Sequence, residues 1–172
     1  MRPTRRRRAD VAALAQPRFE QSGEIQIAGL ARRYPRDKLS LIPDQWNKLA
    51  TQLQFITGRV GPHTYGVWYD VLKGGGEPMR YVTGVKVGAF APIHPDFSRA
   101  IIPPQQYAVF RHQGELTEIR RTVDAIFSQW LPGSGYKHYR HTEDAPDFFE
   151  RYAEGAGGGR PGEVEIWTPV TK

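Results

Sequence analysis

Apolar residues recur at helical spacing in two stretches of the chain, residues 42–56 and residues 116–130. In each stretch the steps between apolar residues alternate between three and four, which gathers them on one face of an α-helix. Ser40 is suited to cap the first helix and Gly58 to end it, and Pro132 and Gly133 are suited to end the second helix. The pattern therefore predicts two amphipathic helices.

Segments rich in β-branched and aromatic residues lie on either side of each predicted helix. One such segment precedes each helix and two follow it, so the chain is ordered strand-helix-strand-strand twice. The proline-rich stretch 88–104 separates the halves and is typical of a connector. The halves are offset by roughly 80 residues, which indicates an internal duplication. The six predicted strands are residues 24–34, 63–72, 79–87, 105–111, 147–152 and 163–170.

This duplication predicts an α+β fold in which two β-α-β-β units are related by a pseudo-twofold axis. Each unit places one helix on a three-stranded sheet and leaves the other face of that sheet bare. We therefore expect one domain over residues 19–172, with units at about 24–87 and 105–170. We also expect the helices on one side of the sheet and a concave ligand cleft on the other, at the junction of the units.

The positive charge of the chain is concentrated at its N-terminus. Arginines in the first eight residues account for most of the formal net charge of +6, so the remainder is close to neutral. We predict that residues 1–18 form a disordered basic tail. The near-neutral remainder argues against a nucleic-acid-binding face within the fold, although the tail itself offers a flexible polycation.

Composition disfavours several classes of site. The chain has no cysteine, which excludes disulfides, thiolate nucleophiles and cysteine-based zinc sites. No apolar run reaches membrane-spanning length and no signal peptide is recognisable, so we expect a cytoplasmic protein without a membrane partner. His138 and His141 lie close together, but their spacing is weak for a metal site. The glycine triplets lack a P-loop signature, and we therefore expect neither a metal nor a cofactor.

The order of short motifs across both halves resembles a known family. The first half carries GLARRY, IPDQW, YGVWYDV and YVTGVKV, and the second carries YAVFRHQG, WLPGSGY, PDFFERY and EVEIWTPV. Over about residues 24–170 these motifs resemble the gyrase-inhibitor-like, AraC-type effector-binding family. No single motif has the specificity of a metal-ligand signature, and the resemblance rests on their shared order.

The resemblance implies a duplicated fold that binds small molecules. Members of that family act as ligand sensors in multidrug-responsive transcription regulators, and others are standalone proteins, including one that protects DNA gyrase. Some standalone members hydrolyse cyclopropane-bearing DNA alkylators. No DNA-binding domain precedes the fold in this sequence, which therefore resembles the standalone class. A glutamate in the penultimate strand anchors cationic ligands in the family, and by motif position it corresponds to Glu150.

The residues around Glu150 point to the same role on chemical grounds. Alternation along a strand puts Glu150 on one face with Phe148 and Tyr152. A carboxylate on the inner side of an aromatic surface is costly unless a cation compensates it. A cationic ligand would do so, and Tyr152 would contact it. The alternative is a structural ion pair between Glu150 and an arginine such as Arg111 or Arg80.

Other aromatic residues are candidates for the same cleft. Trp167 is expected to face away from the helices, and Trp68 shares its face with Gly66, which would keep that surface open. Aromatic faces around a carboxylate suit a delocalised cation, although Trp68 and Trp167 also fit an ordinary core. Phe110 is a weaker candidate. Two further tryptophans, Trp46 and Trp130, lie on the apolar helix faces and are predicted to be core residues.

Three classes of function remain open at this point. The first is reversible binding of cationic amphipathic or flat aromatic molecules, as an effector sensor or sequestering protein. The second is hydrolysis of a reactive small molecule in the same cleft, with Glu150 positioning or deprotonating water. The third is an interaction module that engages DNA gyrase or a transcription regulator. Both a binder and a hydrolase require an acid among aromatic residues, so the sequence does not separate them.

Overall fold

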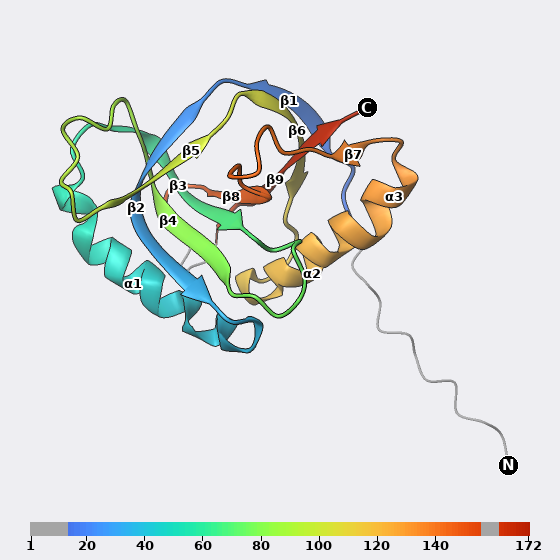
Figure 1. Cartoon of the computed structure of the whole chain (residues 1–172), viewed down its shortest axis with the longest axis horizontal. Helices are drawn as coiled ribbons and strands as arrows, with labels where there is room; N and C mark the ends of the chain where they lie inside the picture. The colour runs from blue at the N-terminus through green and yellow to red at the C-terminus, as the bar shows by residue number, and fades with distance from the viewer. Residues whose placement is uncertain (1–13, 156–161) are drawn as a thin grey trace, which may run out of the picture.

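The computed structural model describes residues 14–155 and 162–172, which form a curved antiparallel sheet with helices against one of its faces (Figure 1). The strands follow the order β1-β6-β9-β8-β3-β4-β2-β5 across the sheet, and β7 pairs with β9. Their bounds are β1 (Arg18–Ser22), β2 (Ile25–Tyr34), β3 (Arg59–Tyr69), β4 (Met79–Val87), β5 (Ser98–Ile102), β6 (Gln105–Arg111), β7 (Lys137–His138), β8 (Phe148–Tyr152) and β9 (Val164–Thr171).

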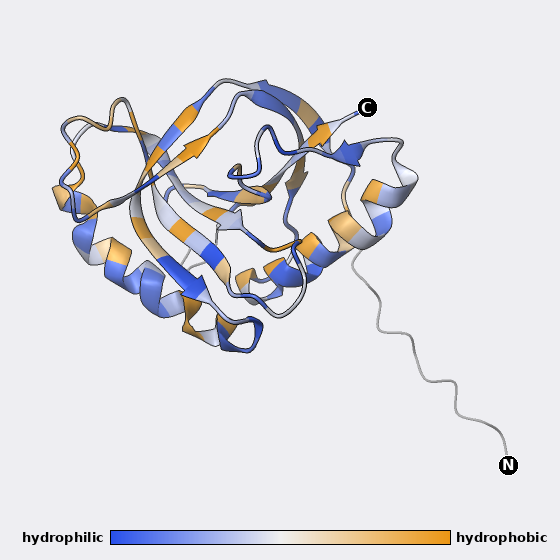
Figure 2. Cartoon of the chain, in the orientation of Figure 1, coloured by the Kyte–Doolittle hydropathy of each residue, from blue (hydrophilic) through white to orange (hydrophobic). Residues whose placement is uncertain are grey.

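Both predicted helices form, each as a run of shorter helical segments. The first comprises η1 (Arg36–Leu41), α1 (Ile42–Gln52) and η2 (Leu53–Phe55). The second comprises η3 (Leu116–Glu118), α2 (Ile119–Ala125), the π-helical η4 (Ile126–Trp130) and α3 (Leu131–Gly133). Figure 2 shows hydrophobic and hydrophilic residues alternating along both runs, as a half-buried helix requires.

One of the expected helix ends differs from the structure. Ser40 lies within η1, and Leu41 is the N-cap of α1 with no side-chain cap hydrogen bond. The second helix ends at Gly133, as expected, with Pro132 within its last turn. Pro132 is the second residue after the π-helical segment, where the ladder of i→i−4 hydrogen bonds is already interrupted, so a missing N–H disturbs little there. No helix within the described residues is both long and apolar enough to cross a membrane.

The internal duplication is confirmed. The first unit runs β2-α1-β3-β4 and the second runs β6-α2-β8-β9, and each unit arranges its three strands in the same spatial order. The two units join edge to edge through β3 and β8 into one sheet. At this junction Gly66 of β3 lies directly opposite Glu150 of β8. The predicted α+β fold class is therefore correct.

Three strands were not expected from the sequence, namely β1, β5 and the two-residue β7. β1 precedes the first unit but pairs with β6 of the second, and β5 precedes the second unit but pairs with β2 of the first. The predicted tail therefore extended too far, because Arg18 begins β1 and Leu14 packs against the core; its first 13 residues lie outside the described part. The predicted connector 88–104 likewise contains β5.

The sheet has hydrophobic clusters on both faces, whereas the sequence predicted that the face opposite the helices would be bare. One cluster lies under the helices and includes Trp46, Leu49 and Ile126. On the opposite face, Ala100 of β5 belongs to one buried cluster with Trp167 of β9, although these strands lie far apart in the sheet order. The sheet therefore curls on itself (Figure 1), and side chains cover much of this face. Tyr69 and Ala100 of the same cluster also line a pocket of about 870 Å³, which does not include Glu150.

Candidate ligand-binding site

A pocket of about 370 Å³ lies between the two helical runs, above the β3–β8 junction. This volume falls within the range of small-molecule sites. Apolar side chains from both helices form its walls, and aromatic side chains from the sheet form its floor. Charged side chains also line the pocket. The lining residues are Arg36, Leu39, Ile42, Pro43, Trp68, Val71, Met79, Tyr81, Leu116, Thr117, Ile119, Arg120, Val123, Asp124, Phe148, Glu150 and Tyr152.

Glu150 lies at the floor of this pocket, and only 4% of the residue's surface is exposed. The Trp68 indole N–H donates a hydrogen bond to Oε1 at 2.6 Å, and the Tyr81 hydroxyl donates to Oε2 at 2.9 Å. The Tyr152 hydroxyl donates to the same Oε2 atom. All three donors are neutral groups, so the carboxylate is oriented by hydrogen bonds without a compensating positive charge.

The alternative of an internal ion pair for Glu150 is not supported. Within residues 14–155 and 162–172, no salt bridge involves Glu150. Arg111 pairs instead with the exposed Glu163. The Arg80 guanidinium lies over the Tyr69 ring, 4.2 Å from its centroid, and Tyr69 faces the opposite side of the sheet from Trp68.

Burial governs the protonation of this cluster. Desolvation raises the pKa of Glu150 above its ordinary value, and the hydrogen bonds from Tyr152, Trp68 and Tyr81, with an electrostatic contribution from His112, partly oppose that rise. Desolvation and the neighbouring Glu150 hold the pKa of both tyrosines well above the usual range. The two hydroxyls therefore stay protonated and remain hydrogen-bond donors to the carboxylate.

Stacked rings make the floor rigid. The Trp68 and Tyr81 rings stack with centroids 4.1 Å apart and an interplanar angle of 24°. The Trp46 ring, on the helix side, meets Tyr152 edge-on at 4.9 Å. Such contacts fix the directions of the donors to Glu150. The pocket therefore offers a preorganised carboxylate surrounded by aromatic surface, which suits a delocalised organic cation.

The family of the chain follows from its sequence. Residues 15–171 match the family described as the GyrI-like small molecule binding domain. The chain belongs to this family. Its members' small-molecule function agrees with the pocket, so the chain is a GyrI-like small-molecule-binding domain.

Three relatives show how far the similarity extends. Transcriptional regulator BrlR of Pseudomonas aeruginosa is 30% identical over 91 residues, which are 52% of this chain and 33% of BrlR. The chain thus matches only a third of that relative's length. The structure of SAV2435 bound to tetraphenylphosphonium is 20% identical with a TM-score of 0.67, covering 91% of this chain and 94% of that one. A hydrolase from Listeria innocua is 10% identical with a TM-score of 0.55, covering 93% and 94%.

The structure of this GyrI-like domain unites some of the expected site residues and separates others. Glu150, Trp68 and Tyr152 line the same pocket. Trp167 lies on the opposite face of the sheet, where its ring stacks on Phe149 at 5.3 Å. Alternation along each strand was assigned correctly for these residues. The pocket, however, lies on the helix face, so Trp167 does not reach it.

Phe110 faces the helices but is also outside the pocket. It is fully buried and packs edge-on against Trp130, with centroids 4.9 Å apart. Tyr81, in contrast, is a site residue that sequence reasoning missed. Strand alternation groups Tyr81 with Met79 and Thr83 on one face of β4, but its contact with Trp68 depends on the pairing register of β3 with β4, which the sequence does not specify.

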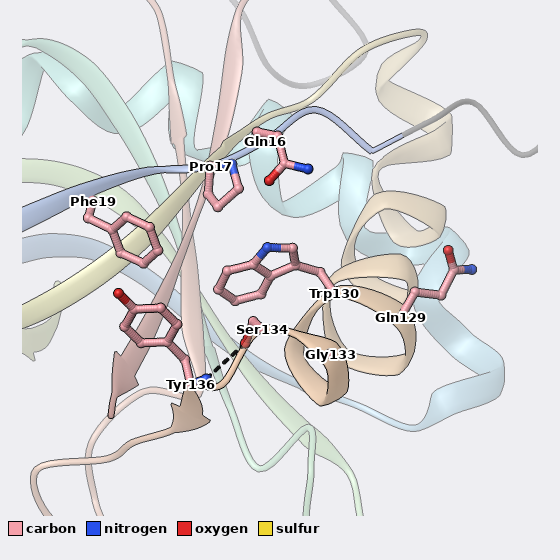
Figure 3. A pocket seen from close by; sticks show the side chains of 8 residues that line it. All are labelled: Gln16, Pro17, Phe19, Gln129, Trp130, Gly133, Ser134 and Tyr136. Atoms are coloured by element: carbon pink, nitrogen blue, oxygen red, sulfur yellow. Dashed lines mark hydrogen bonds between the residues drawn. The ribbon is translucent and has the colours of Figure 1, made fainter.

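Trp130 differs from the expected core residue. It is only partly buried and lines a second pocket of about 480 Å³. Figure 3 shows its ring at the centre of this pocket, beside Phe19 and Tyr136, with the Tyr136 backbone N–H donating to the Ser134 hydroxyl at 3.0 Å. Because Trp130 is partly exposed, it contributes less buried area than Trp46, which is buried as predicted.

Gly66 is expected to be essential to the floor of the pocket. A Cβ atom at this position would lie 2.1 Å from the Tyr81 hydroxyl oxygen, and Tyr81 is fixed by its stack on Trp68. Gly66→Ala should therefore displace Tyr81, destabilise the fold by about 1–3 kcal/mol and weaken ligand binding. Urea denaturation and titration with a fluorescent cationic dye would measure both effects. Gly23→Ala is a matched control, because its Cβ would meet nothing within 4 Å; unchanged affinity in Gly66→Ala would contradict the assignment.

Proposed function

We propose that this GyrI-like domain binds flat or amphipathic organic cations in the pocket between its helices, with Glu150 as the counter-charge. The observation that carries the proposal is the buried Glu150 carboxylate, which accepts hydrogen bonds from three neutral donors and has no cationic partner among the described residues. A bound cation would supply that partner.

Energetics favour this proposal over a purely structural role for Glu150. A buried carboxylate is costly, and an internal cation or an apolar replacement would be the usual solution in a core. Attraction between opposite charges is stronger in a poorly hydrated pocket than in water. Trp68 and Tyr152 would contact the ligand, and Trp68 would supply an aromatic face to it. Tetraphenylphosphonium, which is bound in the SAV2435 structure, is an aromatic cation of this chemical class.

Ligand affinity and protein stability should depend on pH in opposite directions. Binding requires ionised Glu150, so the affinity for a fixed-charge cation should fall as the pH falls through the raised pKa of Glu150. In the unliganded protein the raised pKa favours the protonated form, so its stabilising effect is present at low pH and is lost as the pH rises through that same pKa.

Calorimetric titration with tetraphenylphosphonium between about pH 4 and pH 8 would test the proposal, alongside thermal melts without ligand. The variant Glu150→Gln should lose both pH dependences, because glutamine does not titrate. Affinity that is flat with pH in the wild type would contradict a role for the Glu150 charge.

Hydrolysis of a reactive small molecule is the second candidate function. The observation that favours it is the raised pKa of Glu150, because a carboxyl group tuned upward by burial is suited to acid–base chemistry. Mass spectrometry of a cyclopropane-bearing alkylator after incubation with the protein would distinguish the two functions. Turnover that disappears in Glu150→Gln would favour the hydrolase, and unchanged compound would favour the binder.

A protein-interaction role remains a separate prediction. The exposed outer sides of the edge strands β1 and β5 are the elements that would offer backbone groups to a partner such as DNA gyrase or a transcription regulator. Capture of gyrase that persists when the pocket is filled with a cationic dye would support this role. The cytoplasmic location expected from the sequence also remains a prediction.

A further inference from the structure

The pocket that holds Glu150 also holds two arginines. Arg36 comes from η1 and Arg120 from α2, so they approach the pocket from its two different helical walls. Both are exposed, whereas Glu150 is buried at the floor. The pocket is therefore polarised, with a negative group at its base and positive groups at its mouth, and one acid, Asp124, beside them.

Arg36 is held in position at the mouth. Its Nη2 atom donates a hydrogen bond to the Val71 carbonyl oxygen at 2.7 Å. The Val71 N–H in turn donates to Oδ2 of Asp147 at 2.7 Å, and Asp147 is almost fully buried. The Arg36 guanidinium is thus tied to a fixed segment of backbone, and its remaining N–H groups are left for another acceptor.

Arg120 lacks a counter-charge in the described part of the chain. No carboxylate lies within 4.0 Å of its guanidinium, although Asp124 lies one helical turn further along α2. The adjacent Arg121 differs, because it pairs with Glu118 at 3.0 Å and does not line the pocket. The pair Arg120 and Arg121 therefore provides one arginine at the pocket and one matched arginine outside it.

These charges constrain the ligand. A simple cation that binds Glu150 must also lie near two arginines, and repulsion between the like charges disfavours its binding. We infer that the preferred ligands of this pocket are zwitterions, in which a flat cation faces Glu150 and a carboxylate or similar anionic group faces Arg36 and Arg120. This inference rests on the proposed cation binding at Glu150 and specifies the ligand class for the same site. Arginine is well suited to the task, because its planar guanidinium matches the geometry of a carboxylate.

The inference can be tested with two dyes that differ only at the anionic group. Rhodamine B carries an aryl carboxylate that is ionised at neutral pH, and its ethyl ester keeps the flat cation but lacks the anion. Affinities of both dyes would be measured by fluorescence anisotropy for the wild type and for the double variant Arg36→Gln/Arg120→Gln. The ratio of acid affinity to ester affinity should fall by about threefold to tenfold in the double variant, as expected for ion pairs near the surface.

Matched variants separate this effect from others. Arg121→Gln removes a neighbouring charge outside the pocket and should leave the affinity ratio unchanged. Arg120→Lys keeps the positive charge and should retain most of the wild-type preference for the acid. Glu150→Gln should weaken both dyes by a similar factor and so preserve the ratio. Thermal melts would verify folding, which is expected because both arginines are exposed.

The outcomes distinguish this inference from the proposed function. If both dyes bind and the double variant leaves their affinity ratio unchanged, the zwitterion inference is overturned while cation binding stands. If neither dye binds the wild type, the proposed function fails and the inference fails with it. A ratio that falls only in variants of Arg36 or Arg120 would support the inference.

Discussion

Replacing Glu150 by glutamine should weaken the binding of organic cations by roughly tenfold to a hundredfold, equivalent to about 1.4–3 kcal/mol. Glutamine keeps the shape of the side chain and its ability to accept hydrogen bonds, but it removes the charge. In wild-type protein that charge is buried among Trp68, Tyr81 and Tyr152, and it forms no salt bridge with any residue that the structure describes. Neutral ligands of the same shape should be affected much less.

Stability provides an independent readout for the same variant. The raised pKa of Glu150 indicates that burying its charge is costly in the unliganded protein. Glu150→Gln should therefore leave the fold unharmed or slightly more stable at neutral pH. Greater stability together with weaker cation binding is the combination expected of a ligand-directed charge. A structural residue would instead lose stability on substitution.

Titrations of one cationic and one neutral dye against the wild type and Glu150→Gln would decide this question. The variant Glu77→Gln is a matched control, because Glu77 is exposed in the turn between β3 and β4 and does not line the pocket. Equal losses for both dyes in Glu150→Gln would show that the site recognises shape alone.

The sequence predicts most of the elements of the fold because periodicity is a local property. Strands β4 and β6 begin and end where the sequence predicted, and both apolar helix faces were recognised. Alternation within a single strand was also assigned correctly, since it grouped Glu150 with Phe148 and Tyr152. It did not relate the faces of different strands, so Trp68 and Trp167 were expected in one cleft but lie on opposite faces of the sheet. Features that depend only on neighbouring residues in the chain could therefore be predicted from the sequence.

The position of the pocket could not be predicted from the sequence, because it depends on the pairing of strands that lie far apart in the chain. The short strands β1 and β5 each pair with the other unit, and their sequences RFEQS and SRAII carry no strong strand pattern. Without them each unit appeared to leave one sheet face bare. With them the sheet curls and side chains cover much of that face, while the pocket that contains Glu150 lies between the helices. The same reason explains why Tyr81 was missed, since its place beside Glu150 depends on strand register.

Truncation of Trp46 to alanine should cost about 3–5 kcal/mol of folding free energy, the range for large buried aromatic residues. Trp46 is buried on the inner face of α1, and its ring meets Tyr152 edge-on at 4.9 Å and Tyr81 at 6.4 Å. Its removal would leave a cavity beneath the helix and free both tyrosines that donate to Glu150. Trp46→Ala should therefore also weaken cation binding, even though Trp46 does not line the pocket.

Trp130 provides the comparison for this prediction, because it occupies the other helical run but is only partly buried. Trp130→Ala should cost about 1–2 kcal/mol, since less apolar area returns to water, and it should leave cation binding unchanged because Trp130 lines the second pocket. Urea denaturation of the wild type and both variants would measure the two losses, and dye titration would measure affinity. Equal losses of stability would mean that partial exposure of Trp130 does not reduce its contribution. Near-wild-type stability in Trp46→Ala would contradict the packing of α1 on the sheet, and the rigid tyrosine donors at Glu150 would then need another explanation.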